Sequence, residues 1–309
     1  MKRLFILLTT LTLSSCEDEI FPTLKTNDPI IVVDAWVTNK PEPQTIRLTR
    51  TQDYFTNQFA PGVTGAEVTV TDEDGLIYTF SDQGDGDYVW APTAELPTFG
   101  TSGKSYRLLI EVGSTTLESN TAMGRVPPID SVAFRFEPEG DFLPDSYFAD
   151  VWARDPVGPG DTYWIRTWKN GEYLSKPGEI SLAYDAGFSA GGNVDGLIFI
   201  QPIRDSINPF DEAENDNFLS PYSPGDSVYV EIHSLTDESY KYLADIQIQT
   251  DREGGFGELF ATPLANVGTN VKVISNGGED KVIGFFNIAA VSSAGRFLDP
   301  NNLPGERPE

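Results

Sequence analysis

The sequence predicts a mainly β protein: an immunoglobulin-like β-sandwich, followed by a second β-sandwich or open barrel that carries one α-helix. Three observations predict this fold. The 28 glycines and 22 prolines separate short runs of β-branched and aromatic residues. Polar and apolar residues alternate within these runs. The alternation of strand and helix patterns that a doubly wound fold requires is missing.

Residues 1–15 have the features of a signal peptide. Lys2 and Arg3 form a short basic region, and the apolar run after them is too short to span a bilayer as a stable helix. Small residues then lead to Cys16, the only cysteine of the chain, in the pattern of a bacterial lipobox. We therefore expect cleavage before Cys16 and acylation of its sulfur, each buried CH₂ group contributing about 0.8 kcal/mol to anchoring. An ordinary secretory signal peptide is the alternative.

Three acidic residues, Glu17, Asp18 and Glu19, directly follow the cysteine. They resemble the acidic signal that sends some lipoproteins of Bacteroidetes-type bacteria to the outer face of the outer membrane, although a plain solvated run of charges is the alternative. Residues 16–29 are expected to form the acylated N-terminus and a flexible tether.

Residues 30–126 are expected to form the immunoglobulin-like sandwich, because seven strand-length runs follow one another with turn-forming pieces between them. Within the third run, Val68 and Val70 share one face while polar residues occupy the other, as a half-buried antiparallel strand requires. The seven runs are IIVVDAWVT, QTIRLTR, AEVTVTD, LIYTF, YVWA, KSYRLLIEV and TTLESNTAM.

Pro127 and Pro128 predict a domain boundary, because they lack backbone donors and stiffen the chain. Residues 129–299 are then expected to form the second, β-rich domain, and residues 300–309 a C-terminal tail. The dipeptide Asn170-Gly171 predicts a hairpin turn within this domain. The strand-length runs of this domain are SVAFRFE, YFADVWARD, DTYWIRTWKNGEYL, GLIFIQPI, DSVYVEIHSL, NVKVISN and VIGFFNIAAVSS.

One segment of the second domain has a helical pattern, which predicts a helix over about residues 236–251. Thr236 or Asp237 can cap its N-terminus, and apolar residues recur at helical spacing after the cap.

Taken in order, these segments resemble a family of outer-membrane lipoproteins in Bacteroidetes-type bacteria that is known only as a domain of unknown function. The resemblance covers nearly the whole mature chain, and it has no catalytic residues to carry over. Because members are commonly encoded beside TonB-dependent transporters of the starch-utilisation type, it implies an accessory role in nutrient capture. The matching pieces are the lipobox, IVVDAWVTN, TIRLTRTQDYF, VTGAEVTVTDEDG, GKSYRLLIE, PPIDSV, DPVGPGDTYWIRTWKNGEYL, SLTDESYKYLADIQIQ and GELFATPLANVGTNVKVISNGGEDKVIGFFNIAAVS.

The charge of the chain restricts its partners. A net charge of −26, from 21 basic and 47 acidic residues, repels nucleic acid and anionic lipid headgroups. We therefore expect no nucleic-acid partner.

Calcium is the one metal that the sequence leaves open, because oxygen-only clusters suit a hard cation. Asp82, Asp85 and Asp87 share one loop, but their spacing is not that of an EF-hand, and a solvated acidic loop is the favoured interpretation. No other cofactor is expected. A second acidic group comprises Asp205, Asp211, Glu212, Glu214 and Asp216.

Gly187–Gly191 match the G-x-S-x-G pattern of hydrolases around Ser189, and His233 lies downstream with several aspartates between. That motif belongs between a parallel strand and a helix, and neither pattern is present here. We expect the chain not to be an enzyme, and a serine hydrolase is the remote alternative.

Trp164, Arg166 and Trp168 alternate along one predicted strand and therefore share a face. Exposed, this row could stack on sugar rings or clamp a peptide; buried, its tryptophans would be core residues, which is the favoured interpretation. His233 is predicted to share a strand face with Tyr229 and Glu231, and a lone histidine cannot form a multi-histidine metal site.

The expected function is that of a non-enzymatic lipoprotein of the outer membrane, facing the cell exterior and assisting a TonB-dependent transporter in ligand capture. A structural or adhesive surface module is the alternative, in which the sandwiches serve as spacers.

Overall fold

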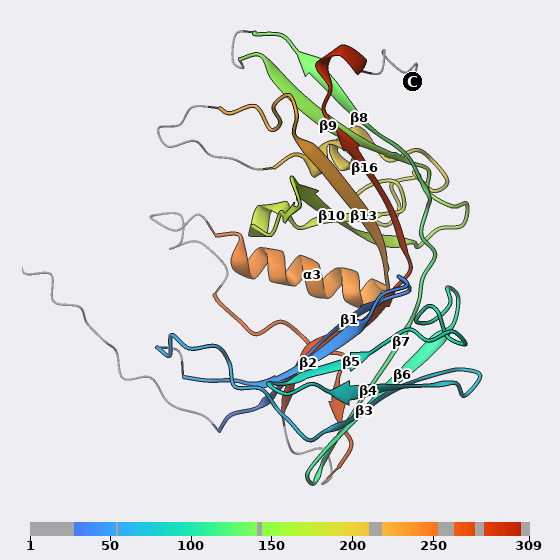
Figure 1. The fold of residues 1–309 in the computed structure, drawn as a ribbon, viewed down its shortest axis with the longest axis vertical. Helices are drawn as coiled ribbons and strands as arrows, with labels where there is room; N and C mark the ends of the chain where they lie inside the picture. Colours follow the sequence, from blue (N-terminus) through green and yellow to red (C-terminus); the bar gives the residue numbers. More distant parts are fainter. Residues whose placement is uncertain are drawn as a thin grey trace, which may run out of the picture.

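A computed structural model of the chain describes residues 28–53, 55–140, 144–209, 218–252, 263–275 and 281–303. Figure 1 shows two β-rich lobes with one long helix, α3 (Asp237–Thr250), between them. The prediction of a mainly β protein is confirmed. All seven strands predicted for residues 30–126 are confirmed as well. They are β1 (Ile31–Thr38), β2 (Gln44–Arg50), β3 (Glu67–Asp72), β4 (Ile77–Asp82), β5 (Asp87–Trp90), β6 (Ser105–Val112) and β7 (Thr115–Ala122).

The first sheet also contains two strands from the far end of the chain, β14 (Lys272–Val273) and β15 (Val282–Ala289). Its nine strands run in the order β14-β7-β6-β3-β4-β5-β2-β1-β15. β15 pairs in parallel with β1 over eight residues, from Val282 opposite Ile31 to Ala289 opposite Thr38. The boundary at the two prolines stays a prediction, but residues 129–299 contribute to the first sheet as well as to the second.

The two ends of this sheet approach each other, so the sandwich-like lobe is one continuous sheet that is nearly closed into a barrel. The side chain of Asn270, just before β14, accepts a hydrogen bond from the Phe286 amide at 2.9 Å and donates one to the Phe286 carbonyl at 2.8 Å. A side-chain amide thus makes the two bonds that a neighbouring strand would make, and it links the β14 end of the sheet to β15.

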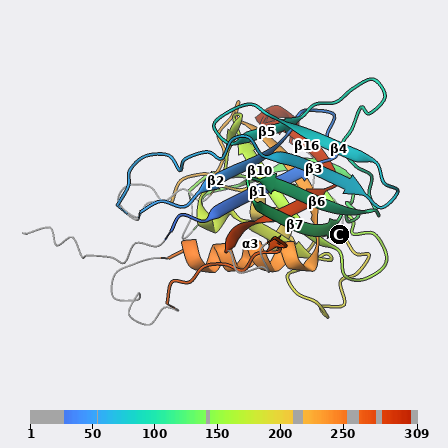
Figure 2. The same ribbon diagram turned by 90° about the horizontal axis from the view of Figure 1, so that it is seen from below.

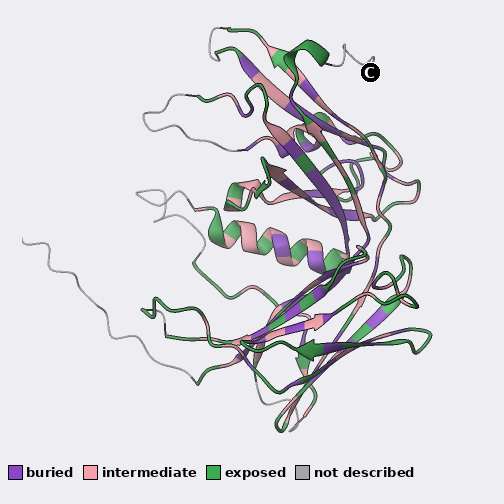
Figure 3. Cartoon of the chain, in the orientation of Figure 1, coloured by how far each residue is buried: buried purple, intermediate pink, exposed green. Residues whose placement is uncertain are grey.

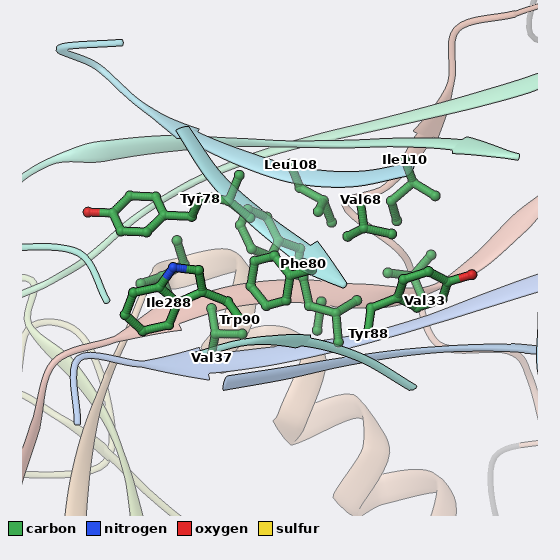
Figure 4. Packing of buried hydrophobic residues seen from close by; sticks show 14 of the residues in the cluster. Val33, Val37, Val68, Tyr78, Phe80, Tyr88, Trp90, Leu108, Ile110 and Ile288 are labelled. Atoms are coloured by element: carbon green, nitrogen blue, oxygen red, sulfur yellow. The ribbon is translucent and has the colours of Figure 1, made fainter. Parts of the chain in front are cut away.

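The core of this lobe consists of the side chains that point inward from the curled sheet (Figure 4). The predicted alternation in β3 is confirmed, since Val68 and Val70 are buried while Thr69 and Thr71 are half-exposed. Fully burying one such aliphatic side chain contributes about 1.5–3 kcal/mol, which lets the lobe hold together without a disulfide. Figure 3 shows the buried positions along the inner side of both lobes.

The second sheet has the order β11-β10-β13-β16, with β12 also paired to β10, and the hairpin of β8 and β9 packs beside it. The predicted turn is confirmed, since Asn170 and Gly171 have φ angles of 53° and 83° between β10 and β11. The strands are β8 (Ile129–Glu137), β9 (Ser146–Ala153), β10 (Thr162–Lys169), β11 (Glu172–Tyr173), β12 (Ser181–Tyr184), β13 (Ser227–Leu235) and β16 (Val291–Phe297). The short helical segments are η2 (Pro177–Glu179), α2 (Gln201–Arg204), η3 (Asp205–Ile207) and η6 (Pro300–Asn302).

The run GLIFIQPI, residues 196–203, is not a strand, in contrast to the prediction. It forms only an isolated bridge at Ile198 and then enters α2. Pro202 explains the change, because it cannot donate to a sheet ladder but is well tolerated in the first turn of a helix. The apolar character of the run still serves burial, since Phe199 and Ile203 lie in the second core.

Helix α3 lies where the sequence predicts a helix, and Thr236 is its N-cap. The Thr236 hydroxyl accepts a hydrogen bond from the Ser239 amide at 3.1 Å. Leu243 packs with Leu182 and Leu235 in a small third core between the helix and the two sheets. In the view from below, α3 runs along one side of the molecule beside the strands of the first sheet (Figure 2).

β15 and β16 are separated by a single residue, Ala290, at which the chain passes from the first sheet to the second. Ala290 is held in place because its amide donates to the Ser234 hydroxyl at 2.8 Å and its carbonyl accepts from the Ser234 amide at 2.9 Å. One continuous segment therefore couples the two sheets.

Gly284 makes the parallel pairing of β1 and β15 sensitive to substitution. Its φ is +100°, and a Cβ added there would lie 2.0 Å from the Val33 carbonyl oxygen, which is backbone and cannot move aside. Gly284→Ala should therefore lower the free energy of unfolding by several kcal/mol, well beyond the roughly 1–2 kcal/mol that a left-handed conformation costs an ordinary residue.

Gly113→Ala is the matched control, because Gly113 has a φ of +60° but nothing within 4 Å of an added Cβ. Urea denaturation of both variants would measure the difference. Equal losses of stability would contradict the close approach of the two strands.

Candidate functional site

A pocket of about 470 Å³ lies between α3 and the two ends of the nine-stranded sheet, and we call it the α3 pocket. Helix α3, β7, residues 268–272 and Phe285 of β15 form its walls. The lining residues are Glu118, Ser119, Asn120, Glu238, Lys241, Tyr242, Asp245, Gly268, Thr269, Asn270, Lys272 and Phe285.

One face of α3 supplies a third of this lining. Lys241, Tyr242 and Asp245 stand three, four and seven residues after Glu238, which places all four on one side of a helix. The buried residues Ser239 and Leu243 lie on a neighbouring face, against the third core. The helix thus packs with one face and lines the pocket with another.

The wall opposite the helix is held in place by hydrogen bonds. The Asn270 side chain bonds the Phe286 backbone, and the Thr269 hydroxyl donates to the Gly284 carbonyl at 2.6 Å. The Ser119 hydroxyl donates to the Asn270 carbonyl at 2.9 Å. These groups serve the closure of the sheet, so this part of the pocket has a defined shape before any ligand enters.

An aromatic side chain forms part of the pocket surface. The Tyr242 ring packs against Phe285, with ring centroids 4.4 Å apart, and both rings contact Trp36 of β1. Burial raises the pKa of the Tyr242 hydroxyl, so Tyr242 is neutral near physiological pH. Tyr242 is therefore an amphipathic ring on α3 that is fixed against the first sheet.

Charged groups of both signs remain available in the pocket. Within the described part of the chain, no hydrogen bond or ion pair involves the side chains of Glu238, Lys241 or Asp245, all of which are exposed. Glu118 differs from them, because hydrogen bonds from Arg107 lower the pKa of its carboxyl, an effect to which Lys272 also contributes. Glu118 is thus already compensated, whereas the helix carries free charges.

The row of Trp164, Arg166 and Trp168 shares one face of β10, as the sequence predicts, and all three residues are half-buried. The Arg166 guanidinium lies 4.7 Å from the Trp164 ring centre and 5.2 Å from that of Trp168. Trp164 also packs edge-on against Trp36, at 5.6 Å. The row is thus partly used for packing between the lobes, and its role as a ligand site stays a prediction.

An ion pair beside this row joins the two lobes. Lys40, just after β1, donates to Glu231 of β13 at 2.7 Å, and the Glu231 side chain is only 3% exposed. His233 shares the strand face of Glu231, as predicted, and its Nε2 lies 2.7 Å from the second carboxylate oxygen. Burial alone would raise the pKa of Glu231, but the hydrogen bonds from His233 and Lys40 outweigh it and lower that pKa to about 2.

Because Glu231 is ionised and can only accept, His233 donates from Nε2. Burial lowers the pKa of His233 itself, against the opposing effect of Glu231, so its ring is neutral near physiological pH. The histidine thus acts as a neutral donor to a buried carboxylate.

Two residues of the loop for which the sequence leaves calcium open, Asp82 and Asp87, have other partners. Asp82 accepts hydrogen bonds from the amides of Gly65 at 2.6 Å and Gly84 at 2.7 Å, and these bonds lower its pKa. Asp87 lies 3.5 Å from the Arg47 side chain, and Asp85 has a positive φ of 51° in the turn. Of the second acidic group, Asp211, Glu212, Glu214 and Asp216 lie outside the described residues.

A different acidic trio has ligand atoms within 4.8 Å of one another, namely Asp155, Asp185 and Asp195. Its carboxylates already accept hydrogen bonds, from the Tyr163 hydroxyl and from the amides of Gly158, Gly160, Asp161 and Gly196. The sequence does not indicate this trio, because only the tertiary fold brings Asp155, which follows β9, next to Asp185 and Asp195 in the segment between β12 and α2.

Ser189 and His233, the residues of the remote hydrolase alternative, have different environments. Ser189 is exposed in a turn after β12, and no helix starts at this turn. His233 is buried and bonded to Glu231, and no hydrogen bond joins it to Ser189 among the described residues. The intervening Asp195 and Asp205 are placed at other sites, with Asp195 in the acidic trio and Asp205 in η3 beside Arg135.

The predicted lipidation and export residues, Cys16 and Glu17 to Glu19, lie outside the described residues. In the part of the chain that is described, no helix combines the length and the apolar character that a membrane span requires.

Comparison with known proteins identifies one family. Residues 17–294 match the family described as Domain of unknown function (DUF4249). A search of curated proteins found no match.

The buried pair of Glu231 and His233 predicts a pH-dependent stability. The pKa of Glu231 falls from an ordinary value of 4.5 to about 2, so the stabilisation is present above 4.5 and is lost as the pH falls toward 2. Glu231→Gln should lower the free energy of unfolding by about 2 kcal/mol near neutral pH. The variant should also lose less stability than the wild type as the pH falls from about 5 to about 2.

Glu42→Gln provides the control, because Glu42 also pairs with Lys40, at 3.0 Å, but its side chain is 53% exposed. It should change stability by less than about 1 kcal/mol. Denaturant titrations over this pH range would test both variants. If Glu231→Gln lost as much stability on acidification as the wild type does, the predicted role of the Glu231 carboxylate would be contradicted.

Proposed function

This chain belongs to the family Domain of unknown function (DUF4249), and for it we propose the role of an outer-membrane lipoprotein that assists a TonB-dependent transporter in capturing a ligand. The observation that carries the proposal is the N-terminal sequence, in which a basic start, a short apolar run and small residues lead to Cys16. The resemblance to lipoproteins encoded beside such transporters supports the choice of partner.

Acylation would contribute to ligand capture by holding the protein at the membrane, beside the transporter. Several acyl chains hold a soluble domain at a lipid surface persistently, since each buried CH₂ group contributes about 0.8 kcal/mol. A protein confined beside its partner needs little intrinsic affinity for it, because confinement raises the effective concentration. The net charge of −26 makes binding to anionic headgroups an unfavourable substitute for this anchor.

The α3 pocket supports the capture part of the role. Its volume of about 470 Å³ falls within the range of about 300–1,000 Å³ that small-ligand sites occupy. It combines an aromatic surface with free charges, and its opposite wall is braced by backbone hydrogen bonds. The proposed role requires no chemical step, only reversible binding and transfer to the transporter.

Cys16→Ala should move the protein from the membrane pellet to the soluble fraction, because the variant has no sulfur atom to which the lipid could be attached. Ser15→Ala is the control, since it keeps a small residue before the cysteine and should leave the protein in the pellet. Intact-mass measurement of the wild-type protein should show an acylated N-terminal cysteine. A wild-type mass equal to that of an unmodified chain would overturn the anchor.

Crosslinked purification from outer membranes, followed by mass spectrometry, tests the partner. We expect a TonB-dependent barrel protein to co-purify, and we expect deletion of the gene to impair growth on a particular nutrient. A deletion that affected only attachment to surfaces, with no transporter recovered, would instead support the structural or adhesive alternative.

A further inference from the structure

We propose that the α3 pocket binds short peptides through their two charged ends. This assignment rests on the proposed capture role, for which it names the ligand class. It is carried by three features of the pocket: free charges of both signs, their spacing along α3 and the fixed aromatic ring of Tyr242.

The charges of the pocket disfavour a ligand whose charges are all of one sign. Lys241 projects from α3 and Lys272 from β14, while Glu238 and Asp245 project from α3 on either side of Lys241 in sequence. An anionic ligand such as a phosphate would meet the carboxylates, and a cationic ligand would meet the ammonium groups. A ligand that carries one charge of each sign satisfies both sets.

The spacing along the helix favours a peptide over a free amino acid. Lys241 and Asp245 are four residues apart, which corresponds to about 6 Å along the helix axis. An extended chain spans about 3.3–3.6 Å per residue, so the two charged ends of a peptide of two or three residues can reach both groups. The two charges of a free amino acid are separated by a single Cα and match this spacing less closely.

The remaining surface suits a peptide side chain and backbone. The Tyr242 ring offers an apolar face that is already held by Phe285 and Trp36, so little ordering is needed on binding. Asn120 lines the same pocket, and although its amide nitrogen donates to Glu118 at 3.4 Å, its side-chain oxygen can accept a hydrogen bond from a peptide group. Because Lys241, Glu238 and Asp245 have no partner among the described residues, a ligand would not have to break an existing ion pair.

Calorimetry on the detergent-solubilised mature protein tests the proposal with defined probes. The probes are the unmodified tripeptides Ala-Phe-Ala, Ala-Leu-Ala and Ala-Ser-Ala, together with acetylated and amidated forms of each, free alanine and maltotriose. We expect saturable binding of at least one unmodified tripeptide. Capping both of its ends should weaken that binding by about tenfold or more, and the other probes should bind less well.

Two pocket variants test the charges, and both should keep the fold because the altered side chains are exposed. Lys241→Gln combined with Lys272→Gln should weaken binding of the tripeptide about tenfold, as should Glu238→Gln combined with Asp245→Asn. Lys281→Gln and Glu95→Gln, exposed residues outside the pocket, are the matched controls and should bind as the wild type does. Circular dichroism melting would verify that each variant is folded.

The proposal is overturned if no unmodified tripeptide binds, if capped and uncapped tripeptides bind equally, or if the pocket variants bind as the controls do. Preferential binding of maltotriose or free alanine would replace the peptide by a sugar or an amino acid. Soluble Cys16→Ala protein should bind the tripeptide as the wild type does, so failure of the anchor or of the transporter partnership is distinguishable from failure of the peptide assignment.

Discussion

The parallel pairing of β1 with β15 determines where the other parts of the molecule lie. Parallel strands cannot be joined by a tight turn, and here the connection between them comprises almost the whole chain, from residue 39 to residue 281. That connection contains every strand of the second sheet except β16, together with α3 and the segment that lines the pocket. Because β15 continues through Ala290 into β16, the same strand that completes the first sheet also borders the second.

The interface that results combines two kinds of interaction. Aromatic rings from β10, α3 and β15 pack around Trp36 of β1. Next to them, Glu231 is buried in its ionised form. Burial of a charge is unfavourable, and here hydrogen bonds from Lys40 and His233 to the two carboxylate oxygens offset it. The aromatic contacts supply apolar burial, whereas the ion pair restricts how Lys40 and β13 can be placed, since any shift would leave a buried charge without a partner.

The α3 pocket is a consequence of this arrangement. Helix α3 buries Leu243 in the third core, so the stripe from Glu238 to Asp245 must face the gap between the ends of the nearly closed sheet. The hydrogen bonds of Asn270 and Thr269 that link the sheet ends also shape the wall of the pocket. The same hydrogen bonds thus close the sheet and shape the pocket, and the charges of the helix stripe have no partner among the described residues because the fold does not use them.

Local patterns in the sequence determine the elements that depend on neighbouring residues. The alternation of Val68 and Val70 with threonines specifies β3, Asn170-Gly171 specifies the hairpin, and the Thr236 cap specifies the start of α3, because each rests on backbone preferences within a few residues. The pattern that predicts an N-terminal signal peptide is local in the same sense. The pairing partner of a strand is not determined locally. The pattern of the run VIGFFNIAA predicts a strand, but it does not indicate that this strand pairs with β1 and not with a strand of residues 129–299. The position of β15, the change of residues 196–203 from strand to α2, the meeting of Asp155 with Asp185 and Asp195, and the α3 pocket were therefore decided only by the tertiary structure. The physical reason is that hydrophobic burial has no direction, so a strand pattern specifies which face is buried but not which strand lies beside it.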